Sequence, residues 1–81
     1  VVNNTNEVFI YPNPSNGNIS IQTDRELGAV TIYNALGEMV YNQTSNKPTV
    51  DASSLNSEVY FITLKDKQQQ IITTKRIVIQ H

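Results

Sequence analysis

The stretch AVTIYNALGEMVYN, residues 29–42, carries the pattern of a β-hairpin. Val30 and Ile32 alternate with other residues in its first half, which places both side chains on the same face of a strand. The next four residues form a short connection, with Gly37 at the left-handed position that glycine occupies without a steric penalty. Residues 38–42 are then the returning strand. This stretch therefore predicts antiparallel β-structure.

Comparable segments lie on both sides of this hairpin. Each is short and rich in β-branched or aromatic residues, and the segments are separated by turn signals such as Pro12-Asn13-Pro14 and Asn16-Gly17. No segment keeps a 3.6-residue periodicity over ten or more positions. The sequence predicts an all-β fold, an immunoglobulin-like β-sandwich of about seven antiparallel strands. The further strands expected are residues 8–11, 18–23, 49–51 and 58–64, and a last strand from Ile71 to the end of the chain.

The connections also carry expectations. Residues 65–70 read as a polar hairpin loop. Residues 52–57 have room for one helical turn, with Leu55 directed inward. The segment 58–64 is apolar on nearly both faces, as expected of a central strand.

Length and composition restrict the class of protein. The chain has 81 residues and a net charge of −1, so we expect one domain with a single thin core and no field that would attract nucleic acid. No apolar stretch approaches the about 20 residues of a membrane helix, and no basic and apolar leader opens the chain. If the domain leaves the cytoplasm, its export signal is expected upstream in a longer precursor. Residues 1–7 are polar and without periodicity, typical of a linker, and residues 8–81 form the expected domain.

Groups suited to catalysis or metal binding are scarce. Cysteine is absent and His81 is the only histidine, at a position where we expect a frayed end, so Ser–His and Cys–His arrangements are excluded. The seven carboxylates are scattered over turns and strands. Asn13, Asn16 and Asn18 offer oxygen ligands for calcium, but turn formation explains them better. We predict no enzyme activity, no cofactor and no metal.

Recognition of sugars usually relies on exposed aromatic side chains. The chain contains no tryptophan, and its four tyrosines are expected to pack in or beside strands. These features do not favour sugar binding. An immunoglobulin-like accessory or carbohydrate-binding module, retained on an extracellular enzyme or adhesin, is nevertheless kept as the alternative function.

Four stretches of the chain form recognisable motifs: YPNPSNG (11–17), IYNALGEMV (32–40), DASSL with VYFI (51–55 and 59–62) and KRIVIQ (75–80). Together they resemble the C-terminal sorting domain of type IX secretion cargo (the Por secretion system), in its type A form. Order and spacing are preserved from residue 8 to residue 80. Two departures stand out: Glu58 replaces a usual glycine, at a cost of about 1 kcal/mol if that position needs a positive φ, and Ala52 replaces a usual leucine.

The resemblance implies a non-catalytic sorting signal that ends a secreted precursor. The implied partners are an N-terminal cargo domain, the type IX translocon and a sortase-like surface peptidase, which removes the domain by a cut upstream of the first strand, at or beside residues 1–7. The cargo would pass through the periplasm and outer membrane and be secreted or held at the cell surface. The motif positions expected to carry recognition are Tyr11, Pro12, Asn13, Pro14, Gly17, Gly37, Tyr60, Lys75, Ile77, Val78 and Ile79.

Two surfaces are expected to meet partners. The last strand can pair with a receptor strand as well as with its own sheet, although the rigid surface of the folded sandwich is the stronger possibility. A second apolar face, covered by cargo or by a twin domain, is expected from Tyr60, Ile62, Leu64, Ile72 and Val78.

Overall fold

The computed structural model describes residues 8–81, which form seven strands and no helix. The expected linker, residues 1–7, lies outside the described residues. No helix in the described range is long and apolar enough to cross a membrane. The strands are β1 (Val8–Tyr11), β2 (Asn18–Thr23), β3 (Ala29–Tyr33), β4 (Met39–Gln43), β5 (Thr49–Asp51), β6 (Glu58–Lys65) and β7 (Ile71–Ile79).

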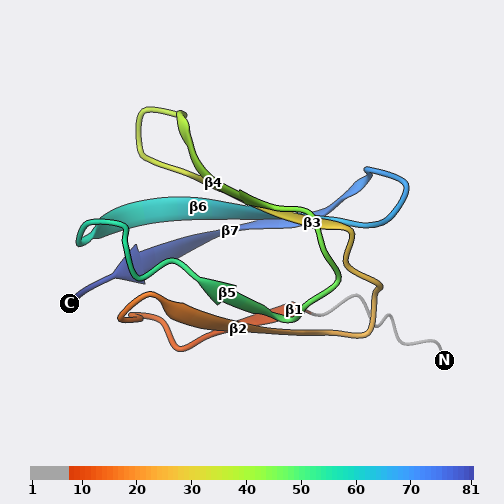
Figure 1. Cartoon of the computed structure of the whole chain (residues 1–81), viewed down its shortest axis with the longest axis horizontal. Helices are drawn as coiled ribbons and strands as arrows, with labels where there is room; N and C mark the ends of the chain where they lie inside the picture. The colour runs from red at the N-terminus through yellow and green to blue at the C-terminus, as the bar shows by residue number, and fades with distance from the viewer. Residues whose placement is uncertain (1–7) are drawn as a thin grey trace, which may run out of the picture.

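The strands form two packed sheets, seen edge-on in Figure 1. The small sheet has the order β1-β2-β5 and the large sheet the order β4-β3-β6-β7, and every strand pair is antiparallel. The prediction of an immunoglobulin-like β-sandwich is confirmed. The expected strand bounds hold to within two residues.

The core lies between the sheets and comes from alternate strand positions. Ile19 and Ile21 of β2 and Val30 and Ile32 of β3 are all buried, as their alternation predicts. Removing such a side chain from water contributes about 1.5–3 kcal/mol. The large sheet supplies most of the remaining core residues: Tyr60, Ile62, Leu64, Ile77 and Ile79.

The expected second apolar face is wrong in its composition. Tyr60, Ile62 and Leu64 lie in the core, and Ile72 is half-buried against it. Of the five residues, Val78 is on the outward side, opposite Val59 in the register of β6 with β7. The outward positions of β6 are instead Val59, Phe61 and Thr63. A strand that is apolar at almost every position gives no alternation from which its inner face can be read.

Glu58 fits its position without a left-handed backbone. It is the first residue of β6 and lies opposite Ile79. Between residues 8 and 81, Gln69 is the only residue other than glycine with a positive φ, 70°. Glu58 therefore does not carry the backbone strain that a positive φ would have imposed.

The connection between β5 and β6 contains a single turn in place of the expected helical one. The amide of Leu55 donates a hydrogen bond to the carbonyl of Ala52 at 3.0 Å, and the chain then enters β6. Leu55 packs against the core, as predicted.

Candidate recognition site

All four motif stretches reach the same end of the sandwich. The register places Tyr33 opposite Phe61 and Glu58 opposite Ile79, so the β3–β4 connection, the β5–β6 connection and the end of β7 lie together. The β1–β2 connection joins them at the left of Figure 1. We call this the motif end, formed by residues 12–17, 34–38, 52–57 and 80–81.

The first motif is bonded to the last. The Val78 amide donates to Oδ1 of Asn13 at 2.9 Å, and Nδ2 of Asn13 donates to the Arg76 carbonyl at 3.4 Å. The Ser15 amide donates to the Val78 carbonyl at 2.9 Å, and the Gln80 amide donates to the Ser15 carbonyl at 2.7 Å. This short parallel bridge covers the outer edge of β7 near its end.

Asparagine is well suited to the position between the two prolines. Proline lacks an amide donor, so Pro12 and Pro14 cannot extend the pairing. The amide side chain of Asn13 supplies a donor and an acceptor in their place. Both prolines follow cis peptide bonds. The sequence predicted that the prolines end β1, but it contained no local signal for the contact with β7.

The first motif is also bonded to the third. Gly17 has a φ of 110°, and a Cβ at this position would lie 2.5 Å from Cα of Ser53. The Ala52 amide donates to the Gly17 carbonyl at 2.7 Å, and the Ala52 side chain is fully buried. Gly17 is therefore required both for its backbone conformation and for the close approach of the β5–β6 connection.

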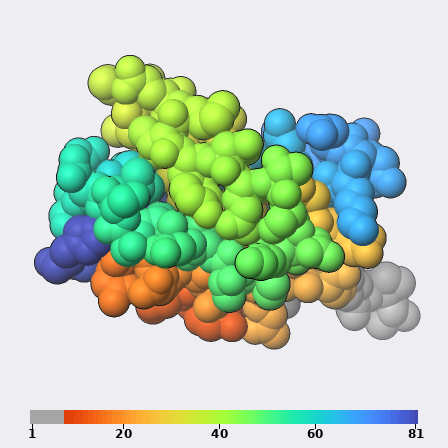
Figure 2. Space-filling view, viewed as in Figure 1, coloured from red at the N-terminus to blue at the C-terminus, as the bar shows by residue number. Residues whose placement is uncertain are grey.

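The third motif continues to the end of the chain. His81 donates its backbone amide to Oγ of Ser57 at 3.1 Å, and its Nε2 lies 2.7 Å from the Leu55 carbonyl oxygen. The expectation of a frayed end at His81 is therefore wrong. The Tyr60 hydroxyl donates to the Asn56 carbonyl at 2.8 Å. Burial raises the pKa of Tyr60 above its ordinary value of 10.0. In Figure 2 the orange, teal and violet atoms of these segments adjoin at the left end.

Asp51 organises the start of the same connection. Its Oδ1 accepts hydrogen bonds from the Ser53 hydroxyl at 2.6 Å and from the Ser53 amide at 3.2 Å. These two bonds, the hydroxyl bond first, hold the pKa of Asp51 below its ordinary value of 3.8. An aspartate followed two residues later by serine is a common local turn, so this feature could be read from the sequence.

The second motif stands apart from the other three. Oδ1 of Asn34 accepts hydrogen bonds from the amides of Leu36 at 3.0 Å and Glu38 at 2.9 Å. Gly37 has a φ of 86° with no atom within 4 Å of where a Cβ would lie, as its predicted left-handed position requires. Leu36 is 84% exposed. This connection is closed by its own residues.

The predicted recognition residues divide by accessibility. Tyr11, Pro12, Asn13, Pro14, Gly37 and Lys75 are exposed, and Val78 is half-buried. Gly17, Tyr60, Ile77 and Ile79 are buried, so their side-chain positions serve packing. Tyr11 is 48% exposed on the outer side of the small sheet, and the expectation that all tyrosines pack in or beside strands misses this exposure.

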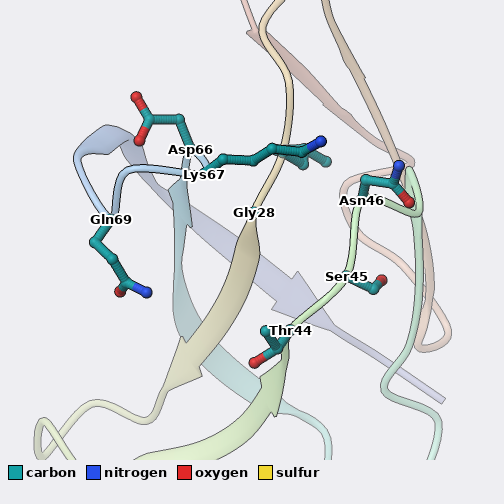
Figure 3. A pocket seen from close by; sticks show the side chains of 8 residues that line it. Gly28, Thr44, Ser45, Asn46, Asp66, Lys67 and Gln69 are labelled. Atoms are coloured by element: carbon teal, nitrogen blue, oxygen red, sulfur yellow. The ribbon is translucent and has the colours of Figure 1, made fainter.

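The opposite end of the sandwich has a shallow hollow of about 470 Å³. Figure 3 shows residues of the β4–β5 and β6–β7 connections around it. Asp66 accepts hydrogen bonds from the amides of Gln70 and Gln68, both at 2.9 Å, and Arg25 lies 3.4 Å away. These contacts, led by the Gln70 amide, hold the pKa of Asp66 below 3.8. Across residues 8–81, no three His, Cys, Asp or Glu side chains are grouped to hold a metal ion.

A two-sheet domain whose terminal loops are bonded to one another belongs to the class of small β-sandwich modules. Residues 9–80 match the family model described as the secretion system C-terminal sorting domain. The chain therefore belongs to the family of type IX secretion C-terminal sorting domains, which is non-catalytic in general. It is a sorting signal, and its precursor is secreted across the outer membrane to the cell surface or the extracellular space. No curated protein matches the chain in sequence.

Proposed function

We propose that the type IX translocon recognises the motif end of the folded domain and that a sortase-like surface peptidase then removes the domain. The domain acts as the sorting signal, and the peptidase supplies the chemistry of cleavage. The cargo is afterwards released or attached to surface lipopolysaccharide. The folded unit in this proposal is residues 8–81, and residues 1–7 are the linker at or beside the cut.

The observation that carries this proposal is the bonding of separate motifs at one end. Asn13 and Val78 are 65 positions apart, yet the side chain of the first accepts the amide of the second. Pro12, Asn13 and Pro14 are exposed, so burial in the core does not account for their presence. A surface assembled from both ends of the domain forms only after folding, and it can therefore report that the domain is complete.

The edge of β7 favours recognition of this rigid surface over pairing with a receptor strand. Pairing requires free amide and carbonyl groups along an edge. From Arg76 to Gln80, the Asn13–Ser15 segment already bonds to this edge. A receptor strand would have to displace that segment before it could pair with residues 76–80.

The test is to fuse residues 1–81 to the C-terminus of a periplasmic reporter in a bacterium that has the machinery. The expected result is delivery of the reporter to the surface with loss of the 9.1 kDa domain. Deleting residues 75–81 should block delivery, because it removes the core residues Ile77 and Ile79 and the partner of Asn13. A reporter that stays in the periplasm with the intact domain, or one delivered normally after the deletion, contradicts the proposal.

One observation favours the accessory-module alternative. Phe9 and Tyr11 are 53% and 48% exposed, and they lie opposite Gln22 and Ser20 on the outer side of the small sheet. An aromatic pair beside amide and hydroxyl groups is a surface on which a sugar ring can stack. Titration of the 81-residue chain with soluble oligosaccharides, followed by NMR shifts at these residues, tests this alternative. Retention of the domain on the mature protein would also favour it.

A further inference from the structure

Exposed apolar side chains of the large sheet are concentrated near the motif end. Eight large hydrophobic residues are exposed among residues 8–81, and five of them come from the β3–β4 hairpin and the first half of β6. Single exposed apolar residues are ordinary on protein surfaces, but a contiguous group marks an interaction site. The five are Leu36 (84%), Met39 (59%), Val40 (37%), Val59 (36%) and Phe61 (38%).

Strand register brings these residues together on the outer face of the large sheet. Tyr33 lies opposite Phe61 on one side and Met39 on the other. A bulge in β4 leaves Val40 as an extra residue beside Met39. Val59 precedes Phe61 by two positions and therefore points to the same face. We call four of the exposed residues, Met39, Val40, Val59 and Phe61, together with the half-buried Tyr33, the outer patch.

The β3–β4 connection stands above one side of the outer patch. In Figures 1 and 2 this yellow-green loop rises from the large sheet on the side away from the small sheet. Leu36 belongs to this loop, and its side chain is the most exposed of the large hydrophobic residues described. Hydrogen bonds to Asn34 within the loop hold it closed, so it presents Leu36 on a defined support.

The outer patch ends at a row of polar residues. Thr31 and Thr63 are opposite one another in the next outward row and are 5% and 7% exposed. The Thr31 hydroxyl donates to Oδ1 of Asn42 at 3.1 Å, and the hydroxyls of Thr63 and Thr74 lie 3.0 Å apart. This half of the face satisfies its own hydrogen bonds and needs no partner. The exposed apolar residues of the large sheet are thus grouped in the half nearer the motif end, and Ile71 is the single large one among the described residues that is exposed at its far end.

One cation borders the outer patch. Arg76 lies opposite Phe61 on β7 and is exposed. The neighbouring outward pair, Val59 with Val78, is uncharged. Apolar and aromatic side chains with an arginine at their border are the composition enriched in protein–protein interfaces. A complementary surface would present apolar side chains and a carboxylate facing Arg76.

The position of Val8 indicates which protein covers the outer patch. Val8 lies opposite Thr23 in the small sheet, at the end away from the motif loops. The chain that precedes it, and hence the cargo, joins the molecule at the other end and in the other layer. We propose that the outer patch is the docking surface for a protein of the export machinery, which inserts apolar side chains over Phe61 and places a carboxylate against Arg76. This inference rests on the proposed function.

The first test uses the reporter fusion with Phe61→Thr, and Ile71→Thr as the matched control. Threonine is compatible with a strand, and neither side chain belongs to the core between the sheets, so both variants should remain folded and unfold cooperatively in urea. Ile71 is 63% exposed in the same sheet but at its far end. Phe61→Thr should lower surface delivery about tenfold, as expected for a central interface residue, while Ile71→Thr leaves it within about twofold.

The second test reverses charge. Arg76→Glu should lower delivery about tenfold, while Lys47→Glu, at an exposed position in the β4–β5 connection, should leave it within about twofold. If the fusions with Phe61→Thr and Arg76→Glu are both delivered as well as the unaltered fusion, the proposed docking surface is wrong, while the proposed function stands. An unaltered fusion that stays in the periplasm defeats the proposed function and this inference with it.

A second copy of the chain is the remaining occupant to be distinguished. We expect the 81-residue chain to sediment as a monomer. A dimer that Phe61→Thr dissociates, with surface delivery unchanged, would assign the outer patch to self-association and overturn the inference.

Discussion

Two connections at the motif end are each closed by an asparagine and a glycine, yet they relate to the rest of the molecule in opposite ways. The β1–β2 connection bonds to β7 through Asn13 and presses Gly17 against the β5–β6 connection. The β3–β4 connection bonds only within itself: Asn34 holds its own loop, and the space around Gly37 is open.

The difference separates two reasons for which a turn motif is present. In the β1–β2 connection the motif joins parts of the fold, so its loss should affect stability and export together. In the β3–β4 connection the motif shapes a loop that presents Leu36 to solvent, so its loss should affect export more than stability. The two glycines and their asparagines therefore provide matched tests.

The largest effect is expected for Gly17→Ala. The substitution places a Cβ 2.5 Å from Cα of Ser53 and also requires alanine to adopt a φ of 110°. Backbone strain and overpacking together should cost about 3 kcal/mol or more. Urea denaturation of the 81-residue chain measures this. A loss below about 1 kcal/mol would show that the β5–β6 connection does not press on Gly17.

Gly37→Ala should be milder, because only the φ of 86° opposes it and nothing lies within 4 Å. The expected loss is about 1–2 kcal/mol by the same denaturation measurement. Gly37→Asn should cost less than Gly37→Ala, since asparagine tolerates the left-handed region. If Gly37→Ala were as damaging as Gly17→Ala, the contrast between the two connections would be refuted.

Asn13→Ala removes one acceptor and one donor that face β7. Because these bonds are exposed to solvent, the expected loss of stability is about 1 kcal/mol. The Val78 amide should also exchange its hydrogen faster, which NMR can follow. Asn13→Asp is the matched variant: it keeps the acceptor for Val78 and should protect that amide better than alanine does. Equal exchange in all three proteins contradicts the role assigned to Asn13.

The smallest effect on stability is expected on acidification. Asp51 at the motif end has a lowered pKa when folded, so its contribution is fully present above its ordinary value of 3.8 and is lost as the pH falls through the lowered value. The thermal midpoint should therefore fall on acidification from about pH 5 to about pH 2. Asp51→Asn should show a shallower fall. An unchanged acid profile would mean that the Ser53 hydrogen bonds do not favour the carboxylate.

Much of the fold was predictable because it depends on local chemistry. The spacing of Val30 and Ile32, two positions apart, identified the inner face of β3. The positive φ values at Gly17 and Gly37 followed from turn chemistry. The inner face of β6 was predicted wrongly, since a strand that is apolar throughout has no readable period. The outer patch was missed for the same reason: Val59 and Phe61 look like core residues until the register with β7 is known.

The residues expected at the candidate site came from the motif resemblance, and their contacts came only from the structure. The resemblance named Asn13 and Val78 as expected recognition positions. It did not indicate that the two are bonded, or that Ile77 and Ile79 serve the core while Pro12 and Pro14 remain exposed. Contacts across 65 positions depend on how the sheets pack, and local patterns carry no information about that.

By itself the amino-acid sequence determined the number of strands, the position of the turns and the class of the domain, because hydrophobic period and turn chemistry act over a few residues. Only the tertiary structure decided which face of each strand is buried, which motifs bond to one another and which apolar residues remain outside. These outcomes depend on strand register and sheet packing, which are set by the whole chain at once.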